Sequence, residues 1–217
     1  MASLKRWLDK RRNPWRAQHL DAYSAWKKER GSSKLYDYSE LPEQAIVFDF
    51  GGFKGEWSDI VLQQIPLASI KIFEPHPGFA SELKTKFQAK QNVETYAFAL
   101  GSKTETLLLS DEGDASSAVA EHSKAFSASF ISVSDFFLSS EIRHIDLAKI
   151  NIEGGEYDLL PALMDAGLIN RFDRLQVQFH LFEPKMQEQR DRIRQQLEAT
   201  HKCVWCYPFV WEEWRLK

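Results

Sequence analysis

The sequence predicts an α/β fold: a doubly wound, mostly parallel sheet with helices on both faces, preceded by a helical N-terminal extension. Two observations carry this prediction. From residue 45 onward, short apolar runs with strand character alternate with helical patterns, and this alternation is typical of a parallel sheet covered by helices. The first 30 residues instead place apolar side chains at helical spacing among many basic ones. We therefore expect an extension over residues 1–40 and one domain over residues 41–217.

The extension is expected to form two short helices separated at Pro14, because proline disfavours a continuous helix. Gly31-Ser32-Ser33 then interrupts the helical pattern. After this break, apolar and β-branched runs predict strands, and apolar residues three or four positions apart predict helices. The expected strands are 45–48, 69–73, 93–97, 105–109, 129–133, 145–152, 175–179 and a last one at 203–207. The expected helices are 57–64, 77–89, 157–164 and 186–199.

Composition excludes several classes of protein. Hydrophobic residues make up 43% and charged residues 27% of the 217 residues, close to the average for soluble globular chains. The longest apolar runs have about five residues, whereas a membrane span needs about 20. The start of the chain has no secretory signal pattern, and its two cysteines cannot form a disulfide framework. We expect a cytoplasmic protein.

The charge is distributed unevenly. Residues 1–30 carry a net charge of +6, and the remaining residues carry −9. The acidic body has no basic stripe, so we expect no nucleic-acid partner. Two interpretations of the basic extension with its three tryptophans stay open: it packs on the domain as a lid, or it contacts a partner or the inner surface of a membrane.

The first candidate binding segment is the turn after the strand 45–48, with the sequence DFGGFKG. Gly51 and Gly52 would let bare main-chain amides approach a ligand, and Gly55 would let the next helix pack tightly. The spacing is not G-x-G-x-x-G, and Asp49 precedes the glycines. Its charge would repel a dinucleotide pyrophosphate and attract a ligand with an amino group and a sulfonium. An ordinary β–turn–α corner is the alternative.

The second candidate is Glu74, at the end of the strand 69–73. A carboxylate in this position can accept hydrogen bonds from both hydroxyls of a ribose. Pro75 and Pro77 would stiffen the turn behind it. A helix N-cap is the alternative role for such an acid.

The third candidate is the strand 145–152 with the residues after it, IDLAKINIEGGE. Strand alternation would put Lys149, Asn151 and Glu153 on one face, and buried polar side chains need partners. Ligands of doubly wound sheets bind at the carboxyl ends of the strands. We therefore expect Asn151 and Glu153 to project toward the ligand. The alternative is that Lys149 only pairs with a neighbouring acid.

Together these segments resemble the FkbM-type, S-adenosylmethionine-dependent methyltransferases. The resemblance covers residues 45–180 and rests on the stretches VFDFGGFKG, FEPHP, ALG, KINIEGGE and QFH. One departure is Asn151, where the family often has Asp. This departure removes a negative charge but keeps a side chain that forms hydrogen bonds.

The resemblance implies a Rossmann-like class I methyltransferase fold and S-adenosylmethionine as cofactor. The implied reaction is methyl transfer to an oxygen, with a hydroxyl of a sugar, a glycan or a glycosylated small molecule as the expected acceptor. A non-methylating nucleotide or sugar-nucleotide binder on the same fold is the alternative. The implied cofactor site contains Asp49, Gly51, Gly52, Phe53 and Gly55 at the methionine half, Glu74 and Pro75 at the ribose, Ala99 and Leu100 at the adenine, and Asn151 near the methyl group.

Methyl transfer to an alcohol benefits from a group that takes the hydroxyl proton. His180, which follows the strand 175–179, is our candidate base, with Glu153 as the rival and Asn151 beside them. A histidine that only shapes the pocket is the alternative. No spacing signature supports a metal ion, and we expect none.

Three weaker patterns complete the prediction. The segment 111–118 is rich in small polar residues, and we expect Ser117, with Ser116 beside it, to contact the cofactor from a loop; a solvent-exposed turn is the alternative. Cys203 and Cys206 form a C-x-x-C motif, but residues three apart on a strand face opposite sides, so we expect neither zinc binding nor redox function. The C-terminal aromatic residues would either form a platform for a glycan or pack the core, and we favour packing: Trp205, Tyr207, Phe209, Trp211 and Trp214.

Overall fold

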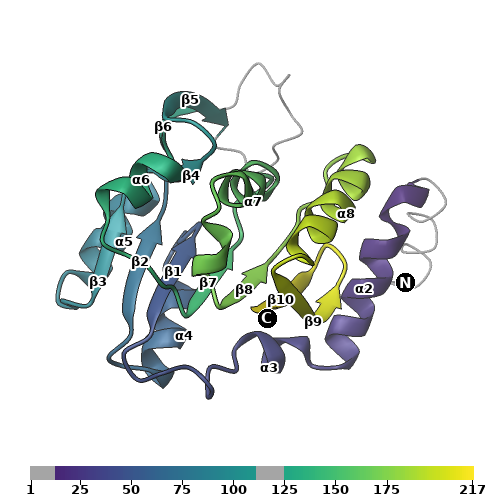
Figure 1. Cartoon of the computed structure of the whole chain (residues 1–217), viewed down its shortest axis with the longest axis horizontal. Helices are drawn as coiled ribbons and strands as arrows, with labels where there is room; N and C mark the ends of the chain where they lie inside the picture. The colour runs from purple at the N-terminus through teal and green to yellow at the C-terminus, as the bar shows by residue number, and fades with distance from the viewer. Residues whose placement is uncertain (1–12, 111–124) are drawn as a thin grey trace.

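A seven-stranded sheet forms the centre of the computed structural model, which describes residues 13–110 and 125–217 (Figure 1). The strand order is β3-β2-β1-β7-β8-β10-β9. Strands β3, β2, β1, β7 and β8 run parallel, and β10 is antiparallel to both of its neighbours. The predicted doubly wound, mostly parallel sheet is confirmed. The bounds are β1 (Ile46–Phe50), β2 (Ser69–Phe73), β3 (Val93–Tyr96), β7 (Leu147–Ile150), β8 (Arg174–Val177), β9 (His201–Tyr207) and β10 (Trp211–Leu216).

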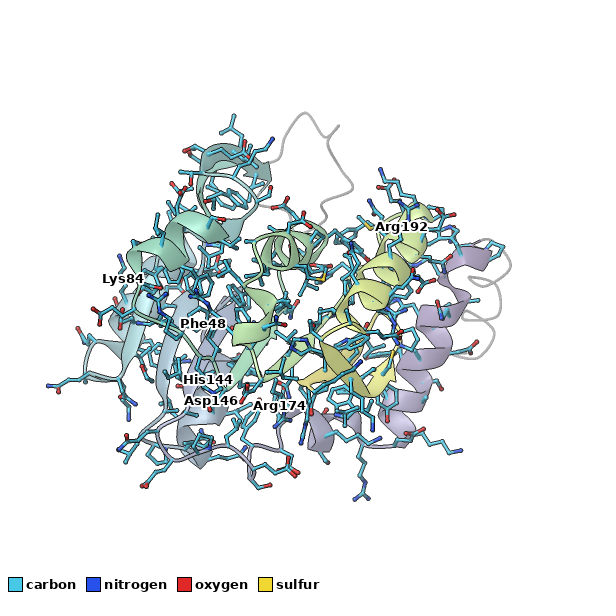
Figure 2. All side chains as sticks on the ribbon, viewed as in Figure 1. Phe48, Lys84, His144, Asp146, Arg174 and Arg192 are labelled. Carbon is cyan, nitrogen blue, oxygen red and sulfur yellow. The ribbon has the colours of Figure 1, made fainter. Side chains whose placement is uncertain are left out.

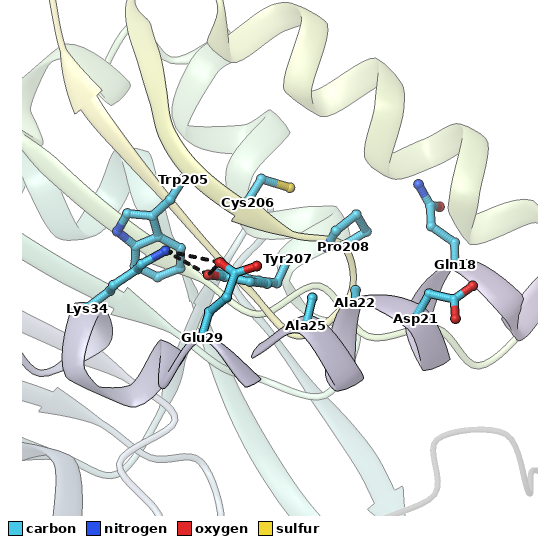
Figure 3. Close-up of a pocket in the computed structure, with 10 residues that line it drawn as sticks. All are labelled: Gln18, Asp21, Ala22, Ala25, Glu29, Lys34, Trp205, Cys206, Tyr207 and Pro208. Atoms are coloured by element: carbon cyan, nitrogen blue, oxygen red, sulfur yellow. Dashed lines mark hydrogen bonds and ion pairs between the residues drawn. The ribbon is translucent and has the colours of Figure 1, made fainter. Parts of the chain in front are cut away.

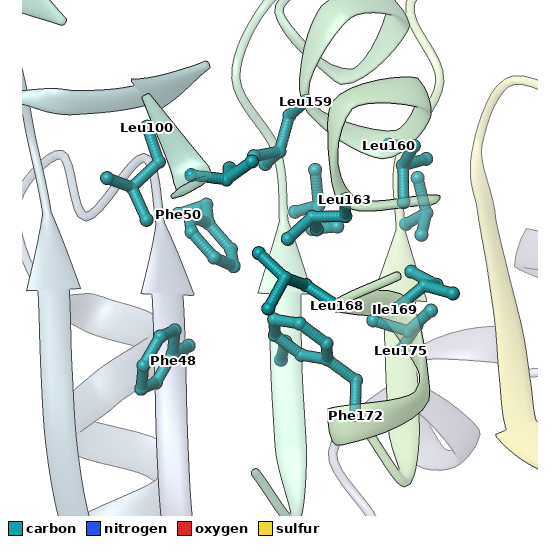
Figure 4. Close-up of a cluster of buried hydrophobic side chains, with 14 of the residues drawn as sticks. Phe48, Phe50, Leu100, Leu159, Leu160, Leu163, Leu168, Ile169, Phe172 and Leu175 are labelled. Atoms are coloured by element: carbon teal, nitrogen blue, oxygen red, sulfur yellow. The ribbon is translucent and has the colours of Figure 1, made fainter. Parts of the chain in front are cut away.

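Helices cover both faces of the sheet, as the sequence predicts (Figure 1). One core lies under α6 (Val133–Ser139), α7 (Glu156–Asp165) and α8 (Lys185–Leu197), and the other under α4 (Glu56–Gln64) and α5 (Pro77–Phe87). Alternation along β1 divides its side chains between these cores, with Phe48 and Phe50 in the first and Val47 in the second. Figure 4 shows the first core, where leucines of α7 lie close to Phe50.

The parallel register brings the carboxyl ends of β1, β2 and β7 to one edge of the sheet. Phe50 at the end of β1 pairs with Phe73 at the end of β2 and with Ile150 at the end of β7. Each of these strands is followed by a segment that the sequence singles out. This edge is also where ligands of doubly wound sheets bind.

A separate three-stranded sheet follows β3, with the order β4-β6-β5. It consists of β4 (Ala99–Gly101), β5 (Glu105–Ser110) and β6 (Ala125–Ser132), and Figure 1 draws it above the carboxyl ends of β1 and β2. The sequence predicts two strands here but not this second sheet. Its β6 is also longer than the expected strand 129–133, and α6 begins where that strand was expected to end.

The expectation that 203–207 is the last strand is wrong, because β10 inserts between β8 and β9. Glu212 and Glu213 in this strand are 1% and 0% exposed. Because both residues are charged, the segment does not read as an apolar run, and hydrophobic patterning does not predict a buried strand there. Each carboxylate is paired: Glu213 lies 2.6 Å from Arg174, and Glu212 lies 2.9 Å from Arg190. Pairing is the condition under which charges are buried.

The N-terminal segment packs on the edge of the sheet beside β9 (Figure 1). It contains a short 3₁₀ turn, Pro14–Arg16, followed by α2 (Ala17–Lys28) and α3 (Gly31–Leu35). Trp26 of α2 meets Tyr207 of β9 edge to face, with ring centroids 5.2 Å apart. The helix expected before Pro14 lies outside the described residues. None of the described helices combines the length and the apolar character that a membrane crossing requires.

Candidate functional site

The glycines after β1 are required by the packing of the protein itself. A Cβ atom on Gly51, whose φ is +81°, would lie 2.2 Å from the main-chain oxygen of Asn151. A Cβ atom on Gly52 would lie 2.2 Å from the Cγ2 of Ile72. These clashes concern an added side chain and not the main-chain amides of Gly51 and Gly52, so the approach of those amides to a ligand stays a prediction. Gly55 behaves as the sequence predicts, since a Cβ atom there would lie 2.7 Å from Phe87 of α5.

Asp49 does not face a ligand with a free charge, which corrects the second expectation for this turn. Its side chain is 0% exposed. One carboxylate oxygen lies 2.9 Å from Lys149 Nζ, and the other accepts a hydrogen bond from Ser58 Oγ at 2.7 Å. Lys149 also donates to the main-chain oxygen of Gly51 at 2.5 Å. The alternative for Lys149, pairing with a neighbouring acid, is what the structure shows, and the pair fixes β7 against the turn.

Glu74 lies at the end of β2 and holds the β1 turn through its carboxylate. Oε2 accepts from the main-chain N–H of Phe53 at 2.8 Å, and Oε1 accepts from the N–H of His76 at 2.9 Å. Burial raises the pKa of Glu74, and the two main-chain hydrogen bonds oppose that rise. A carboxylate offers about four lone-pair positions, so each oxygen can accept one more hydrogen bond from a ligand. Pro75 follows it half-buried.

Backbone strain marks the segments that follow β1 and β7. Phe53 and Glu153 both have φ of +48°, in the left-handed region of backbone conformation that residues other than glycine rarely adopt. Strained residues of this kind concentrate at functional sites. Phe53 is 50% exposed and Glu153 is also exposed, whereas Asn151 is half-buried. β7 ends at Ile150, so the expected strand alternation does not extend to Asn151 and Glu153.

His180 follows β8 and is held from two sides. Its main-chain N–H and its Nδ1 both face Glu156 Oε1, at 2.6 and 3.2 Å. The hydroxyl of Tyr157 donates to the His180 carbonyl at 2.6 Å, and the ring stacks on Phe182 with centroids 5.5 Å apart. Because Nδ1 faces a carboxylate oxygen, it carries a proton, which leaves Nε2 as the acceptor.

Glu156 is the site residue that the sequence does not single out. It is 0% exposed at the start of α7, and its Oε2 accepts from the N–H of Gly154 at 2.9 Å. It thus ties the glycine turn after β7 to His180. An acid in the first turn of a helix is common because it complements the helix dipole. What distinguishes Glu156 is its complete burial and its contact with His180, and no sequence pattern shows either.

Two further predicted residues lie on β4. Ala99 is half-buried, while Leu100 is 3% exposed and packs in the core under α7 (Figure 4). The side chain of Leu100 therefore does not face a ligand, and only its main chain remains as a contact. Ser117 lies outside the described residues.

Aromatic rings connect the β1 turn with the second sheet. Ring centroids of Phe53 and Phe79 are 4.5 Å apart, those of Phe79 and His76 are also 4.5 Å apart, and those of His76 and Phe126 are 4.3 Å apart. This row begins beside Glu74 and ends on β6. It forms a partly exposed apolar border to the edge where the predicted site residues gather.

The N-terminal segment reaches the same edge near His180. Gln187 of α8 donates to the main-chain oxygen of Trp15 at 2.7 Å. Burial lowers the pKa of His19, and the charges of Arg16 and His180 lower it further. Since the charge on His180 affects the pKa of His19, the two rings lie close enough to interact electrostatically.

Three further features of the described residues are a possible set of metal ligands and two cavities. His144 Nε2 is 3.1 Å from Asp146 and 3.3 Å from Asp173, a set that could hold a metal ion. The two aspartates immediately precede β7 and β8, so the set lies at the opposite edge, in the lower part of Figure 2. One cavity of about 560 Å³ lies between α2 and β9 (Figure 3), and another of about 630 Å³ lies beside β3 and α6. None of the predicted site residues lines either cavity.

The comparisons with known proteins give a family for the sequence and a fold for the structure. The sequence model of the methyltransferase FkbM domain matches residues 49–203. The structure is similar to that of a proposed rRNA methylase from Clostridium thermocellum, at a TM-score of 0.53 and 9% identity over 86% of this chain and 94% of the other. It is also similar to a proposed methyltransferase from Streptococcus mutans in complex with SAH, at a TM-score of 0.50 and 9% identity over 86% of this chain and 97% of the other. No curated protein matches the chain.

Proposed function

Since the chain belongs to the FkbM methyltransferase family, we propose that it transfers a methyl group from S-adenosylmethionine to a hydroxyl oxygen of a sugar, a glycan or a glycosylated small molecule. The family and the Rossmann-like class I methyltransferase fold support methyl transfer as the reaction and S-adenosylmethionine as the methyl donor. The observation that supports an oxygen acceptor is His180, which Glu156 holds at 3.2 Å with Nε2 left to accept a proton.

The residues at the sheet edge fit this cofactor. Glu74 is buried, anchors the β1 turn and keeps acceptor capacity for the two hydroxyls of a ribose. The turn from Gly51 to Gly55 would hold the methionine half, with Asp49 acting through Lys149 rather than directly. Ala99 and the main chain of Leu100 would lie at the adenine. When bound, S-adenosylmethionine supplies a methyl carbon that its sulfonium already activates.

The remaining task of the chain is to orient the acceptor and remove its proton. Holding two reactants in attack geometry contributes much of the rate of such a displacement. His180 accepts the hydroxyl proton on Nε2, while Glu156 keeps Nδ1 protonated and stabilises the charge that forms on the ring. Glu153, exposed after β7, is the rival base, and Asn151 would orient the acceptor by hydrogen bonding.

A sugar acceptor is supported by the aromatic border of the site, not by the C-terminal aromatic residues. Tyr207, Phe209 and Trp214 are 6%, 3% and 0% exposed, so core packing, the favoured interpretation, accounts for them. The ring of Phe182 beside His180 and the exposed Phe53 remain as apolar surfaces for a sugar. A nucleic-acid acceptor is not expected, because the chain outside residues 1–30 carries a net charge of −9.

The test has two stages. Calorimetric titration of the protein with S-adenosylhomocysteine, NAD and UDP-glucose should show saturable binding of the first compound alone. Incubation with isotopically labelled S-adenosylmethionine and a panel of glycosides, carboxylic acids and amines should then give labelled methyl ethers of the glycosides. Binding of UDP-glucose or NAD without S-adenosylhomocysteine would support a nucleotide binder instead, and label found only in methyl esters or methylamines would contradict the hydroxyl acceptor.

A further inference from the structure

Cys203 and Cys206 lie on the same face of β9, although a regular strand would put residues three apart on opposite faces. The cause is a register shift in the pairing of β9 with β10, whose paired residues are Cys206–Glu212, Trp205–Glu213 and Cys203–Trp214. Val204 is the extra residue of this β-bulge, and it is 47% exposed. The expectation that the two thiols diverge is therefore wrong.

The bulge also shortens the distance between the two cysteines. Their partners on β10, Glu212 and Trp214, are two positions apart, which corresponds to about 7 Å between the Cα atoms. Disulfides form at Cα separations up to about 6.8 Å. A small closure of the bulge therefore brings Cys203 and Cys206 within bonding range.

Two arginines of α8 cover this face and favour a thiolate. Arg194 Nη1 lies 3.9 Å from the Sγ of Cys203 and 3.4 Å from that of Cys206, and Arg190 Nη2 lies 3.0 Å from Cys206 Sγ. A hydrogen bond from Cys206, together with the charge of Arg194, lowers the pKa of Cys203 to about 7 against the effects of burial and of the Glu212 charge. The same hydrogen bond raises the pKa of Cys206.

Both cysteines are partly exposed, and one of them borders a cavity. Both thiols are half-buried. Cys206 is among the residues that line the cavity of about 560 Å³ between α2 and β9 (Figure 3). None of the residues that we place in the methyl-transfer site contacts either sulfur, among the contacts of the described residues.

We propose that Cys203 and Cys206 form a dithiol site that reacts with low-molecular-weight disulfides and closes to a reversible intramolecular disulfide. With oxidised glutathione, the Cys203 thiolate attacks one sulfur, a mixed disulfide forms, and one glutathione thiolate leaves. Cys206 then loses its proton and attacks the Cys203 sulfur, which releases the second glutathione. The two cysteines lose two electrons and two protons, and one oxidised glutathione becomes two reduced molecules.

The test incubates the reduced full-length protein with oxidised glutathione and measures intact mass and free thiols. The wild-type protein should lose two hydrogen atoms, retain no glutathione and recover its thiols in dithiothreitol. Cys206→Ser should stop at the mixed disulfide, with one glutathione on Cys203. At pH 7, iodoacetamide should alkylate Cys203 about tenfold faster than Cys206 or more, because a thiolate is the nucleophile.

An unfolded peptide with the sequence of residues 201–208 is the reference, and Cys203→Ser is the matched control. The control should acquire glutathione more slowly than Cys206→Ser does. Retention of glutathione on the wild-type protein, two unreacted thiols under conditions that oxidise the peptide, or equal reactivity of Cys203 and Cys206 would each overturn the proposal.

Discussion

At the scale of single residues, Glu156 determines how His180 is presented. Its Oε1 faces both the main-chain N–H and the Nδ1 of the histidine, and its Oε2 holds Gly154. A carboxylate in this position fixes the ring orientation and the tautomer, as in other acid–histidine pairs. Nε2, the nitrogen that we propose accepts the proton, is then the one that points away from Glu156.

His180→Ala should lower kcat by about 100-fold or more, because general-base catalysis contributes at least that much. Affinity for S-adenosylhomocysteine should stay within about twofold, since we do not place the ring among the residues that contact the cofactor. Glu156→Gln should cause a smaller loss of kcat, because the amide preserves shape but not charge. Steady-state kinetics and calorimetry measure both quantities.

Glu153→Gln is the matched comparison for this prediction. If Glu153 is the base, it should carry the large loss instead. A reduction of kcat below tenfold in His180→Ala, with cofactor affinity unchanged, would remove the histidine from the mechanism.

Glu74→Gln should weaken S-adenosylhomocysteine binding by about 10- to 100-fold, because hydrogen bonds to a charged acceptor contribute about 1.5–3 kcal/mol. Part of that loss arises from the β1 turn, since Phe53 and His76 donate to the same carboxylate. Glu82→Gln, an exposed carboxylate on α5, is the control and should bind normally. Calorimetric affinities that are equal for both variants would show that Glu74 is not the ribose ligand.

At the scale of elements, buried ion pairs hold β10 in the sheet. Glu213 and Arg174 are 0% and 5% exposed, and Gln176 also donates to Glu213 at 3.2 Å. Removing one member of such a pair leaves the other charge buried without compensation. The strand therefore has little tolerance for loss of either charge.

Glu213→Gln should reduce the free energy of unfolding by about 3 kcal/mol or more, because breaking a buried pair costs about 3–5 kcal/mol. Glu188→Gln is the control: its partner Arg192 is one helical turn away, and both side chains are more than 70% exposed. An exposed pair contributes about 0.5 kcal/mol. Urea unfolding compares the two variants, and a similar small change in both would refute the importance of burial here.

The helix α2 is attached by its apolar face. Trp26 is 8% exposed, whereas Tyr23 on the same helix is 45% exposed. Trp26→Ala should lower the free energy of unfolding by about 3 kcal/mol, the cost of deleting a large buried aromatic side chain. Tyr23→Ala should change it by less than about 1 kcal/mol. Equal effects in thermal and urea unfolding would indicate that α2 is not docked on β9 in solution.

At the scale of the whole molecule, acid should weaken the fold through His201. The imidazole is 0% exposed, with Nε2 2.8 Å from the Phe172 carbonyl and Nδ1 2.7 Å from Thr200 Oγ1. Burial lowers the pKa of His201 below its ordinary value of 6.5. The unfolded chain therefore takes up the proton first as the pH falls.

The stabilisation from neutral His201 is fully present above pH 6.5 and decreases as the pH falls toward the pKa of the folded state. The decrease should be about 1.4 kcal/mol per pH unit within that interval. Urea unfolding of wild type and His201→Gln at pH 7.5 and pH 5.5 measures it, with exposed Lys202→Gln as control. An equal pH dependence in wild type and His201→Gln would contradict this assignment.

The parallel part of the sheet was predictable because each strand, buried on both faces, reads as a short apolar run. Strand β1 with its glycine turn and β2 with Glu74 illustrate this. By contrast, β10 carries two buried glutamates whose partners, Arg174 and Arg190, come from distant positions. The sequence also did not predict that Cys206 lies on the same face of β9 as Cys203, because a bulge depends on the pairing register of two strands.

The candidate site was predictable where one segment defines it and unpredictable where two segments meet. Glu74 and Gly55 follow from local patterns. The neutralisation of Asp49 by Lys149 and the support of His180 by Glu156 require the fold, since the partners are 100 and 24 positions apart.

The docking of α2 on β9 has a consequence for synthesis. Trp26 leaves the ribosome long before Tyr207 and Val210, the residues that cover it, have been added. At a translation rate of about 5–20 residues per second, about 10–40 s pass between the synthesis of Trp26 and that of these two residues. During that interval the N-terminal segment, which is aromatic and positively charged, is exposed on the nascent chain. Chaperones would bind it in this period.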